Sequence, residues 1–306
     1  MKIMVFDVGG TEIKYSVMDE QMHRTDSGAV PTPQDTQAQF LDTVYRLYAP
    51  HKDEVSGIAM ALPGFVDNRT GYVSNGGALL YNTATPVGQL LAEKCGCPVI
   101  LENDGKAAAM AELANGALKD CCNAAVFIIG TGVGGGIIAN GQLVRGVHFT
   151  AGEYSFVNTN AEAWDAPDQN MACQCSTSNL LKWYRARKAL PEDAPLDGRS
   201  FFAAANAGEP EALEVLRRFC HAVAVQIYNL TVLLDVEKVA IGGGISKQPL
   251  LLESLRSAYD GLYASRAGQA YMEGLPRCQI VPCAFSSGAN QVGVAAAYFE
   301  AMQKKC

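Results

Sequence analysis

Clusters of glycine at the ends of apolar runs constrain this sequence more than any other feature. The chain has 30 glycines among 306 residues, against an average usage of about 7%. Three groups directly follow apolar segments that predict strands: Gly9-Gly10, Gly130-Thr131-Gly132 and Gly242-Gly243-Gly244. Glycine lets a strand turn tightly and lets another molecule approach the backbone closely. The pattern therefore indicates turns that can receive a ligand.

The predicted elements form a hairpin followed by alternating helices and strands, and this order occurs twice. The hairpins are predicted over 2–8 with 12–18 and over 124–129 with 134–139. Further strands are predicted at 55–62, 98–102, 237–241 and 278–283, helices at 35–49, 86–95, 104–118, 209–234, 249–263 and 289–303, and a polar loop at 158–178. Asp104 is expected to cap the helix that it opens. Two α/β units of similar design are expected.

Composition excludes several classes of protein. The chain is 49% hydrophobic and has a formal net charge of -7, so it has enough apolar surface for a core. The acidic balance argues against a nucleic-acid partner, which needs a basic face. No window of about 20 apolar residues predicts a membrane helix, and the N-terminus lacks the core of a signal peptide. A cytoplasmic protein is expected.

The glycine turns are interpreted as phosphate loops. Backbone N–H groups of Gly9, Gly10 and Thr11, and of Gly130, Thr131 and Gly132, can converge on a phosphate group. Asp7, at the end of the first strand, can hold Mg²⁺ through water. Gly242, Gly243 and Gly244 leave room for an adenine and a ribose. The alternative is that these are ordinary turns; neither a Walker loop nor a Rossmann fingerprint is present.

The ordered set of motifs resembles the ROK family of sugar kinases. The matching runs are Asp7-Val-Gly-Gly-Thr11 with Lys14, Pro63-Gly64, Glu102-Asn103-Asp104, Gly130-Thr-Gly-Val-Gly-Gly-Gly136, Ala151-Gly152-Glu153 and Ile241-Gly-Gly-Gly-Ile-Ser246. The resemblance implies two facing actin-like (ribonuclease H-like) α/β domains with an interdomain cleft for a sugar and MgATP. The expected domains are 1–118, completed by the helix 289–306, and 119–288. Lys14 is expected at the nucleotide site.

The resemblance also assigns the residues that act on the sugar. Asp104 matches the family's general base, which takes the proton of the acceptor hydroxyl; the alternative is a helix cap. Asn103 and Glu153 match residues that bind sugar hydroxyls, and their alternatives are a loop amide and a surface carboxylate. Gly64 and Asn82 are further candidates for the sugar site.

The sequence departs from the family at its zinc site. The expected histidine is replaced by Phe156 and the third cysteine by Leu180, so only Cys173 and Cys175 of four ligands remain. Structural zinc almost always takes four ligands, so none is expected here. The cysteine pair is interpreted as a remnant or as a redox-sensitive loop.

The same departure bears on the substrate. Phe156 removes a donor near the anomeric carbon and adds an aromatic wall, as in β-glucoside kinases of this family. A glucoside or disaccharide phosphorylated on its 6-hydroxyl is therefore expected, with glucose and N-acetylated hexosamines as alternatives. Lys106 is a second departure: it is expected either to face solvent or to approach the phosphate and the base.

Other classes fit less well. The family's repressors carry a DNA-binding domain before the first strand, which here begins at residue 2. A catalytically weak sugar sensor and a different actin-like ATPase also stay open, although Asp7, Thr11, Asp104 and Thr131 favour a kinase. Family members are commonly homodimers, and a homodimer is expected.

Overall fold

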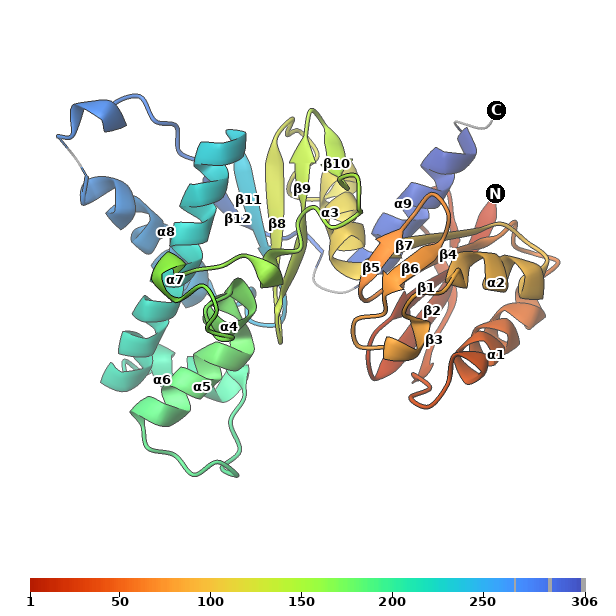
Figure 1. Ribbon diagram of the computed structural model, residues 1–306, viewed down its shortest axis with the longest axis horizontal. Coiled ribbons are helices and arrows are strands. Elements are labelled where there is room, and N and C mark those ends of the chain that lie inside the picture. Colours follow the sequence, from red (N-terminus) through yellow and green to blue (C-terminus); the bar gives the residue numbers. More distant parts are fainter. Residues whose placement is uncertain (267, 286–287, 304–306) are drawn as a thin grey trace. The chain divides into compact units, whose positions relative to one another are not determined.

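The computed structural model describes residues 1–266, 268–285 and 288–303, which form two compact units (Figure 1). The first unit comprises Met1–Gly116, Leu143–Ala151 and the described part of Ser287–Cys306. The second comprises Ala117–Gln142 and the described part of Gly152–Ser286. None of the helices in the described residues has both the length and the apolar character needed to cross a membrane.

The first unit is built on a five-stranded sheet of order β3-β2-β1-β4-β7. Its strands are β1 (Lys2–Val8), β2 (Glu12–Asp19), β3 (Arg24–Pro31), β4 (Ile58–Leu62) and β7 (Val99–Asn103). The first three are antiparallel, whereas β1, β4 and β7 are parallel. The accompanying elements are α1 (Gln37–Tyr48), α2 (Val87–Cys95), α3 (Asp104–Asn115), α9 (Ala289–Gln303) and a ribbon of β5 (Phe65–Asp67) and β6 (Tyr72–Asn75).

The second unit repeats this plan in the order β10-β9-β8-β11-β12. Its strands are β8 (Ala124–Ile129), β9 (Val133–Ala139), β10 (Gln142–Val144), β11 (Lys238–Gly242) and β12 (Gln279–Pro282). Its helices are α4 (Met171–Cys175), α5 (Thr177–Arg187), α6 (Gly198–Asn206), α7 (Pro210–Leu234) and α8 (Pro249–Ala264). Short 3-10 helices occur in the two units at Ala49–His51, Leu80–Asn82, Tyr154–Phe156, Ala161–Ala163 and Ala270–Met272.

The strongest sequence patterns gave the right elements. Both hairpins are present, and the predicted mixture of two α/β units is confirmed by the repeated sheet order. The last three residues of the helix expected over 289–306 lie outside the described residues. Strand β3 went unpredicted because it is a polar edge strand with mostly exposed residues. The polar loop expected over 158–178 is wrong in its second half, where α4 and the start of α5 are helical.

The long helix α7 supplies much of the core of the second unit. Phe219, Cys220, Val223 and Ile227 are all 0–1% exposed. Leu213, Leu230 and Leu234 are only half-buried at the edge of the same core. Ala212 and Val215 are buried as well, so the buried face of α7 includes small and β-branched side chains.

Helices α3 and α9 pack unusually closely in the first unit. A Cβ atom built on Gly293 of α9 would lie 1.7 Å from the carbonyl oxygen of Ala107 in α3. The facing stretch of α3 is a run of three alanines, Ala107–Ala109, which leaves room for this approach. The contact holds α3, and therefore its first residue Asp104, against the C-terminal helix.

We expect Gly293→Ala to destabilise the protein by about 3 kcal/mol, because the new methyl group would overlap backbone that cannot move far. Gly261→Ala in α8 is the matched control: nothing lies within 4 Å of its added Cβ. Removing a glycine from a helix interior there should stabilise by up to about 1 kcal/mol. Urea unfolding of both variants checks the pair, and equal stabilities would contradict the close packing.

Candidate active site

The first glycine turn, Gly9-Gly10-Thr11, joins β1 to β2. The N–H of Gly9 donates to the carbonyl oxygen of Glu12 at 2.9 Å, and the carbonyl oxygens of Gly9 and Gly10 accept from Thr32 and Gln34. Within the described part of the chain, the N–H groups of Gly10 and Thr11 donate to no other protein group. Two successive N–H groups without partners in an exposed turn can receive an anion.

Asp7 lies two residues before this turn and is partly exposed. The side-chain amide of Asn290, in α9, donates to Asp7 Oδ1 at 2.8 Å, which fixes the carboxylate. A fixed carboxylate beside an anion-receiving turn has the chemistry that Mg²⁺ prefers. Lys14 faces Asp7 across the β1–β2 pairing, but its side chain is exposed and its Nζ lies 3.9 Å from Glu12 Oε2.

The second turn, Gly130-Thr131-Gly132, has the same design in the second unit. It joins β8 to β9, and the N–H of Gly130 donates to the carbonyl oxygen of Gly132 at 2.9 Å. Among the described residues, no protein acceptor is bonded to the N–H of Thr131 or Gly132. The Gly130 carbonyl oxygen accepts from the N–H of Thr177, which ties the turn to the start of α5.

The three glycines that follow β11 have different roles. A Cβ atom on Gly242 would lie 2.5 Å from Ile128, and one on Gly243 would lie 2.0 Å from the carbonyl oxygen of Ile129. Glycine is therefore required at position 243, where the neighbour is backbone, and Gly242 packs against the Ile128 side chain of β8. Both positions correct the expectation that all three glycines face a ligand. Gly244 is different because its surroundings are open.

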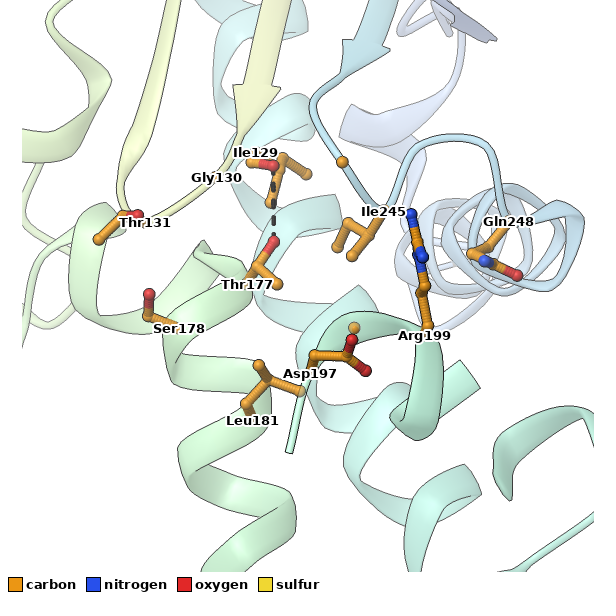
Figure 2. Close-up of a pocket in the computed structure, with 12 residues that line it drawn as sticks. Ile129, Gly130, Thr131, Thr177, Ser178, Leu181, Asp197, Arg199, Ile245 and Gln248 are labelled. Atoms are coloured by element: carbon orange, nitrogen blue, oxygen red, sulfur yellow. Dashed lines mark hydrogen bonds between the residues drawn. The ribbon is translucent and has the colours of Figure 1, made fainter. Parts of the chain in front are cut away.

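Gly244, Gly130 and Thr131 line a pocket of about 440 Å³ in the second unit. Figure 2 shows the pocket bounded by the first residues of α5 and α6 and by the turn after β11. Its other lining residues are Ile129, Thr177, Ser178, Leu181, Asp197, Gly198, Arg199, Ile245 and Gln248. Two helix N-termini, each with a positive dipole end, favour an anionic ligand there, and the isoleucines and Leu181 offer apolar walls.

The charged pair in this pocket was not found from the sequence. Asp197 caps α6, and the Ser200 N–H and hydroxyl groups bonded to it lower the pKa of its carboxyl. Arg199 follows it in the first turn of the helix (Figure 2). The spacing of Asp197 and Ser200 is typical of a capping box at the start of a helix, but nothing in this pattern indicates a ligand.

A second set of predicted residues comes together in the first unit. Asn103 Nδ2 donates both to the carbonyl oxygen of Gly64, at 2.9 Å, and to Asp104 Oδ1, at 3.1 Å. Gly64 has φ of +94°, and a Cβ there would lie 2.0 Å from the carbonyl oxygen of Asn75, so glycine is required. Gly64, Asn103 and Asp104 thus form one cluster at the β7–α3 junction.

The capping prediction at this junction is wrong by one residue. Asn103, not Asp104, is the N-cap of α3, and its Oδ1 accepts from the N–H of Lys106 at 3.0 Å. Asp104 is the first helical residue and is partly exposed; its Oδ1 also accepts from the N–H of Gly105 at 2.8 Å. The cap of α3 is therefore made by Asn103 and not by Asp104.

Lys106 does not face solvent. Its exposed fraction is 1%, which makes it one of the largest fully buried side chains of the described residues. A buried ammonium group is costly unless it is paired, so this lysine is part of the interior around the β7–α3 junction. Of the two expectations for Lys106, the solvent-facing one is wrong.

The remaining sugar-site candidates differ in their surroundings. Asn82 is 1% exposed, and its Oδ1 accepts from Gln37 Nε2 at 3.2 Å. Glu153 is half-buried in the second unit, at the start of a 3-10 turn. It follows Gly152, whose φ of +77° and close approach to Gly136 require glycine.

Two of the four positions at which the resemblance expects zinc ligands are packed in the core. Leu180 and Cys175 are 0% and 1% exposed in the core of the second unit. Burial raises the pKa of the Cys175 thiol to about 12, which disfavours the thiolate that zinc requires. Phe156 is 71% exposed, and Cys173 Sγ lies 3.8 Å from the carbonyl oxygen of Pro167.

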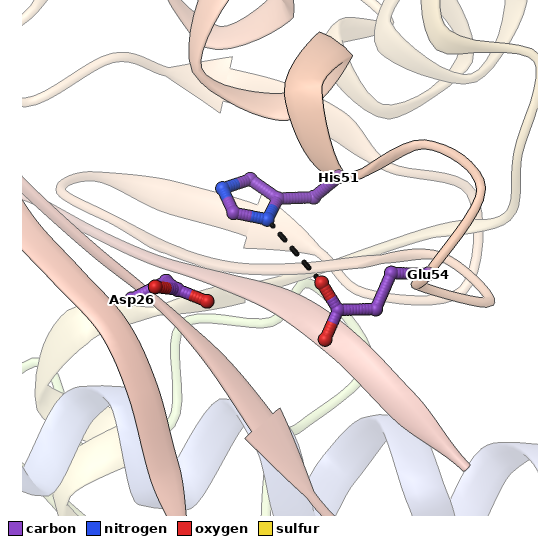
Figure 3. Close-up of side chains that lie close together, drawn as sticks. All are labelled: Asp26, His51 and Glu54. Carbon is purple, nitrogen blue, oxygen red and sulfur yellow. Dashed lines mark ion pairs between the residues drawn. The ribbon is translucent and has the colours of Figure 1, made fainter.

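One other group of metal-ligating atoms occurs among the described residues. Asp26, His51 and Glu54 bring one ligand atom each to within 4.8 Å of one another (Figure 3). Glu54 is already paired with Lys2 at 2.5 Å and with His51 at 3.6 Å. We interpret the group as a surface ion-pair network, because a lysine ammonium group already neutralises its central carboxylate.

The repeated sheets define an α/β fold of two units, as in the solved ROK structures that it resembles. The sequence model of the ROK family matches residues 3–300, and the chain belongs to this family. The predicted family and fold are therefore confirmed.

Known relatives are sugar kinases by name. A beta-glucoside kinase of Listeria innocua is 30% identical over 258 residues, which cover 84% of this chain and 87% of that protein. An N-acetyl-D-glucosamine kinase of Vibrio atlanticus is 31% identical over 277 residues, with 82% and 86% covered. A ROK family protein from Streptococcus pneumoniae, solved in complex with sucrose, is 28% identical with a TM-score of 0.87, and 99% and 100% of the two chains align. These names agree with the predicted enzyme class, an ATP-dependent sugar kinase.

We expect purified protein to contain well below one zinc ion per chain, because two of the four family ligands are replaced and Cys175 is a core thiol. Elemental analysis by mass spectrometry measures this directly. Cys173→Ser should leave the melting temperature unchanged with or without a chelator. One zinc per chain that is lost in Cys173→Ser would show that the pair still binds metal.

Proposed function

We propose that the protein transfers the γ-phosphoryl group of ATP to the 6-hydroxyl of a hexose or hexoside. The observation that carries the proposal is the carboxylate of Asp104, held at the β7–α3 junction by the Asn103 amide and the Gly105 N–H. A carboxylate fixed in this way at the start of a helix is suited to accept a proton from a sugar hydroxyl.

The pocket of the second unit is the proposed nucleotide site. Its 440 Å³ volume suits a nucleoside, and its apolar walls and Arg199 suit a purine base. The unpartnered N–H groups of Thr131 and Gly132 are available to phosphate oxygens. Gly244 leaves room beside the base, whereas Gly242 and Gly243 only support it.

The first unit supplies the groups for the acceptor and for the terminal phosphates. Asn103, which donates to the Gly64 carbonyl oxygen, is proposed to bind a sugar hydroxyl. Glu153 is a further proposed ligand of a sugar hydroxyl. As the 6-oxygen attacks the γ-phosphorus, Asp104 takes the hydroxyl proton, the bond from phosphorus to the bridging oxygen breaks, and ADP leaves. Gly9, Gly10 and Thr11 contribute N–H groups to the phosphates.

Asp7 is the proposed ligand of Mg²⁺, through water. The carboxylate fits this ion because Asn290 orients it beside a turn with free N–H groups. When bound, Mg²⁺ neutralises charge on the phosphates and thereby favours transfer. Lys14, exposed on β2, is a proposed further positive charge for the nucleotide.

The acceptor is proposed to be a β-glucoside or disaccharide. The side chain at position 156 is an exposed aromatic ring near Glu153 in sequence, which suits a second ring on the substrate. The names of the Listeria relative and of the sucrose-bound protein agree with this choice. N-acetylhexosamines are the second candidate, because the Vibrio relative carries that name.

Three further parts of the proposal concern organisation. We propose a homodimer, a cytoplasmic location where ATP is available, and domains of 1–118 with the C-terminal helix and of 119–288. Light scattering after size-exclusion chromatography tests the dimer.

We expect Asp104→Asn to fold and to lose at least about 100-fold in kcat, because the amide cannot take the hydroxyl proton. The assay couples ADP release to a colour change across gentiobiose, cellobiose, glucose and N-acetylglucosamine. Asp42→Asn, on the exposed face of α1, is the control and should retain full activity. Near-normal turnover by Asp104→Asn would remove Asp104 from the role of base.

We expect Gly244→Val to raise the KM for ATP by about 10-fold or more and to leave the KM for the sugar unchanged, because the side chain would fill the nucleotide pocket. The fold should survive, since nothing lies within 4 Å of the added Cβ. Gly243→Ala should instead unfold the protein at lower urea concentration, because its methyl group meets the Ile129 carbonyl oxygen. An unchanged KM for ATP in folded Gly244→Val would place the nucleotide elsewhere.

A further inference from the structure

Arg145 forms an ion pair with the buried carboxylate of Glu102 in the first unit. Arg145 Nε lies 2.8 Å from Glu102 Oε2. The Glu102 side chain is only 1% exposed, whereas that of Arg145 is 27% exposed. A carboxylate removed from water to this degree needs a charged partner, and removing the partner leaves an uncompensated buried charge.

The other oxygen of the same carboxylate is bonded to the active-site backbone. Glu102 Oε1 accepts from the N–H of Asn103 at 3.0 Å. Asn103 in turn caps α3 and donates to Asp104 Oδ1 and to the carbonyl oxygen of Gly64. A continuous chain of contacts therefore runs from the Arg145 guanidinium group to the proposed base.

Arg145 also orders the segment that leads to Glu153. Its carbonyl oxygen accepts from the N–H of Ala151 at 3.2 Å, which closes a loop over residues 145–151. The same side chain contacts Met110 of α3, with 3.5 Å between Nη2 and Sδ. Arg145 thus contacts Met110 of α3, the carboxylate of Glu102 and the loop over residues 145–151.

We propose that Arg145 is a positioning residue for the phosphoryl transfer, acting through Glu102 to hold Asn103 and Asp104 in their productive orientation. The inference rests on the proposed function. It makes Arg145 a requirement for turnover although it lies outside the groups that we assign to either substrate. A displacement of about 1 Å at a reacting group can cost 100-fold in rate, so a support of this kind is measurable.

The experiment uses the full chain and four variants: Arg145→Met, Arg145→Lys, Glu102→Gln and the double variant Glu102→Gln with Arg145→Met. We expect Arg145→Met to lower kcat by about 100-fold and to change the KM for ATP by less than about 2-fold. Arg145→Lys keeps the charge and should restore part of kcat. The double variant should be about 10-fold more active than Arg145→Met, because a neutral amide needs no cation and still accepts from the Asn103 N–H.

Arg187 and Glu214 provide a matched control. Their Nε–Oε2 distance is also 2.8 Å, but both side chains are about half exposed. Arg187→Met, Glu214→Gln and their double variant should keep kcat within about 2-fold of the wild type, because exposed pairs contribute little. Urea unfolding of every variant separates loss of fold from loss of positioning.

The outcomes distinguish the inference from the proposed function. A wild type that phosphorylates no sugar of the panel overturns both. An active wild type in which Arg145→Met keeps kcat, or loses it only in proportion to its unfolded fraction, overturns the inference alone. The inference also fails if the effects of Glu102→Gln and Arg145→Met simply multiply, since the pair would then not act as a unit.

Discussion

Close approach of backbone to backbone, which only glycine permits, is the constraint on which both units depend. Gly243 lies against the carbonyl oxygen of Ile129, Gly64 against that of Asn75, and Gly293 against that of Ala107. Each contact supports a different part of the proposed site: the nucleotide pocket, the Asn103–Asp104 cluster and the helix that begins with Asp104. The glycines act mainly by allowing these elements to pack, and only a few of them face a ligand.

The parts of the fold that the sequence predicted are those with strong apolar patterns. Strands β1, β4 and β8 are buried along nearly their whole length, so their apolar runs are unbroken. Strand β3 carries Arg24, Thr25, Asp26 and Ser27 at exposed edge positions, and no pattern distinguishes it from a loop. Its place in the sheet is determined by pairing with β2, which is a tertiary effect.

The sequence allowed the residues of the candidate site to be predicted. It did not allow prediction of which residue caps a helix, which is buried and which lines the pocket. The motif identified both Asn103 and Asp104 as site residues. Which of the two caps α3 depends on side-chain geometry, and the motif does not determine that geometry. Lys106 reads as a surface residue in any window of sequence, and its burial results from elements distant in the chain. Arg199 and Thr177 both line the pocket because two helices begin beside it, and no local pattern indicates that these two helix starts lie together.

The segment around Cys173 and Cys175 is held by backbone pairing and by buried apolar side chains. Val157 and Asn158 pair with Met171 and Asn170, and the N–H of Thr159 donates to the carbonyl oxygen of Gln169. Met171, Cys175 and Leu180 then anchor the segment in the core at 0–1% exposure. Each buried apolar side chain contributes about 1.5–3 kcal/mol, so these three stabilise the segment substantially. The core therefore holds this segment through apolar packing, and Phe156 lies outside that core with its ring 71% exposed.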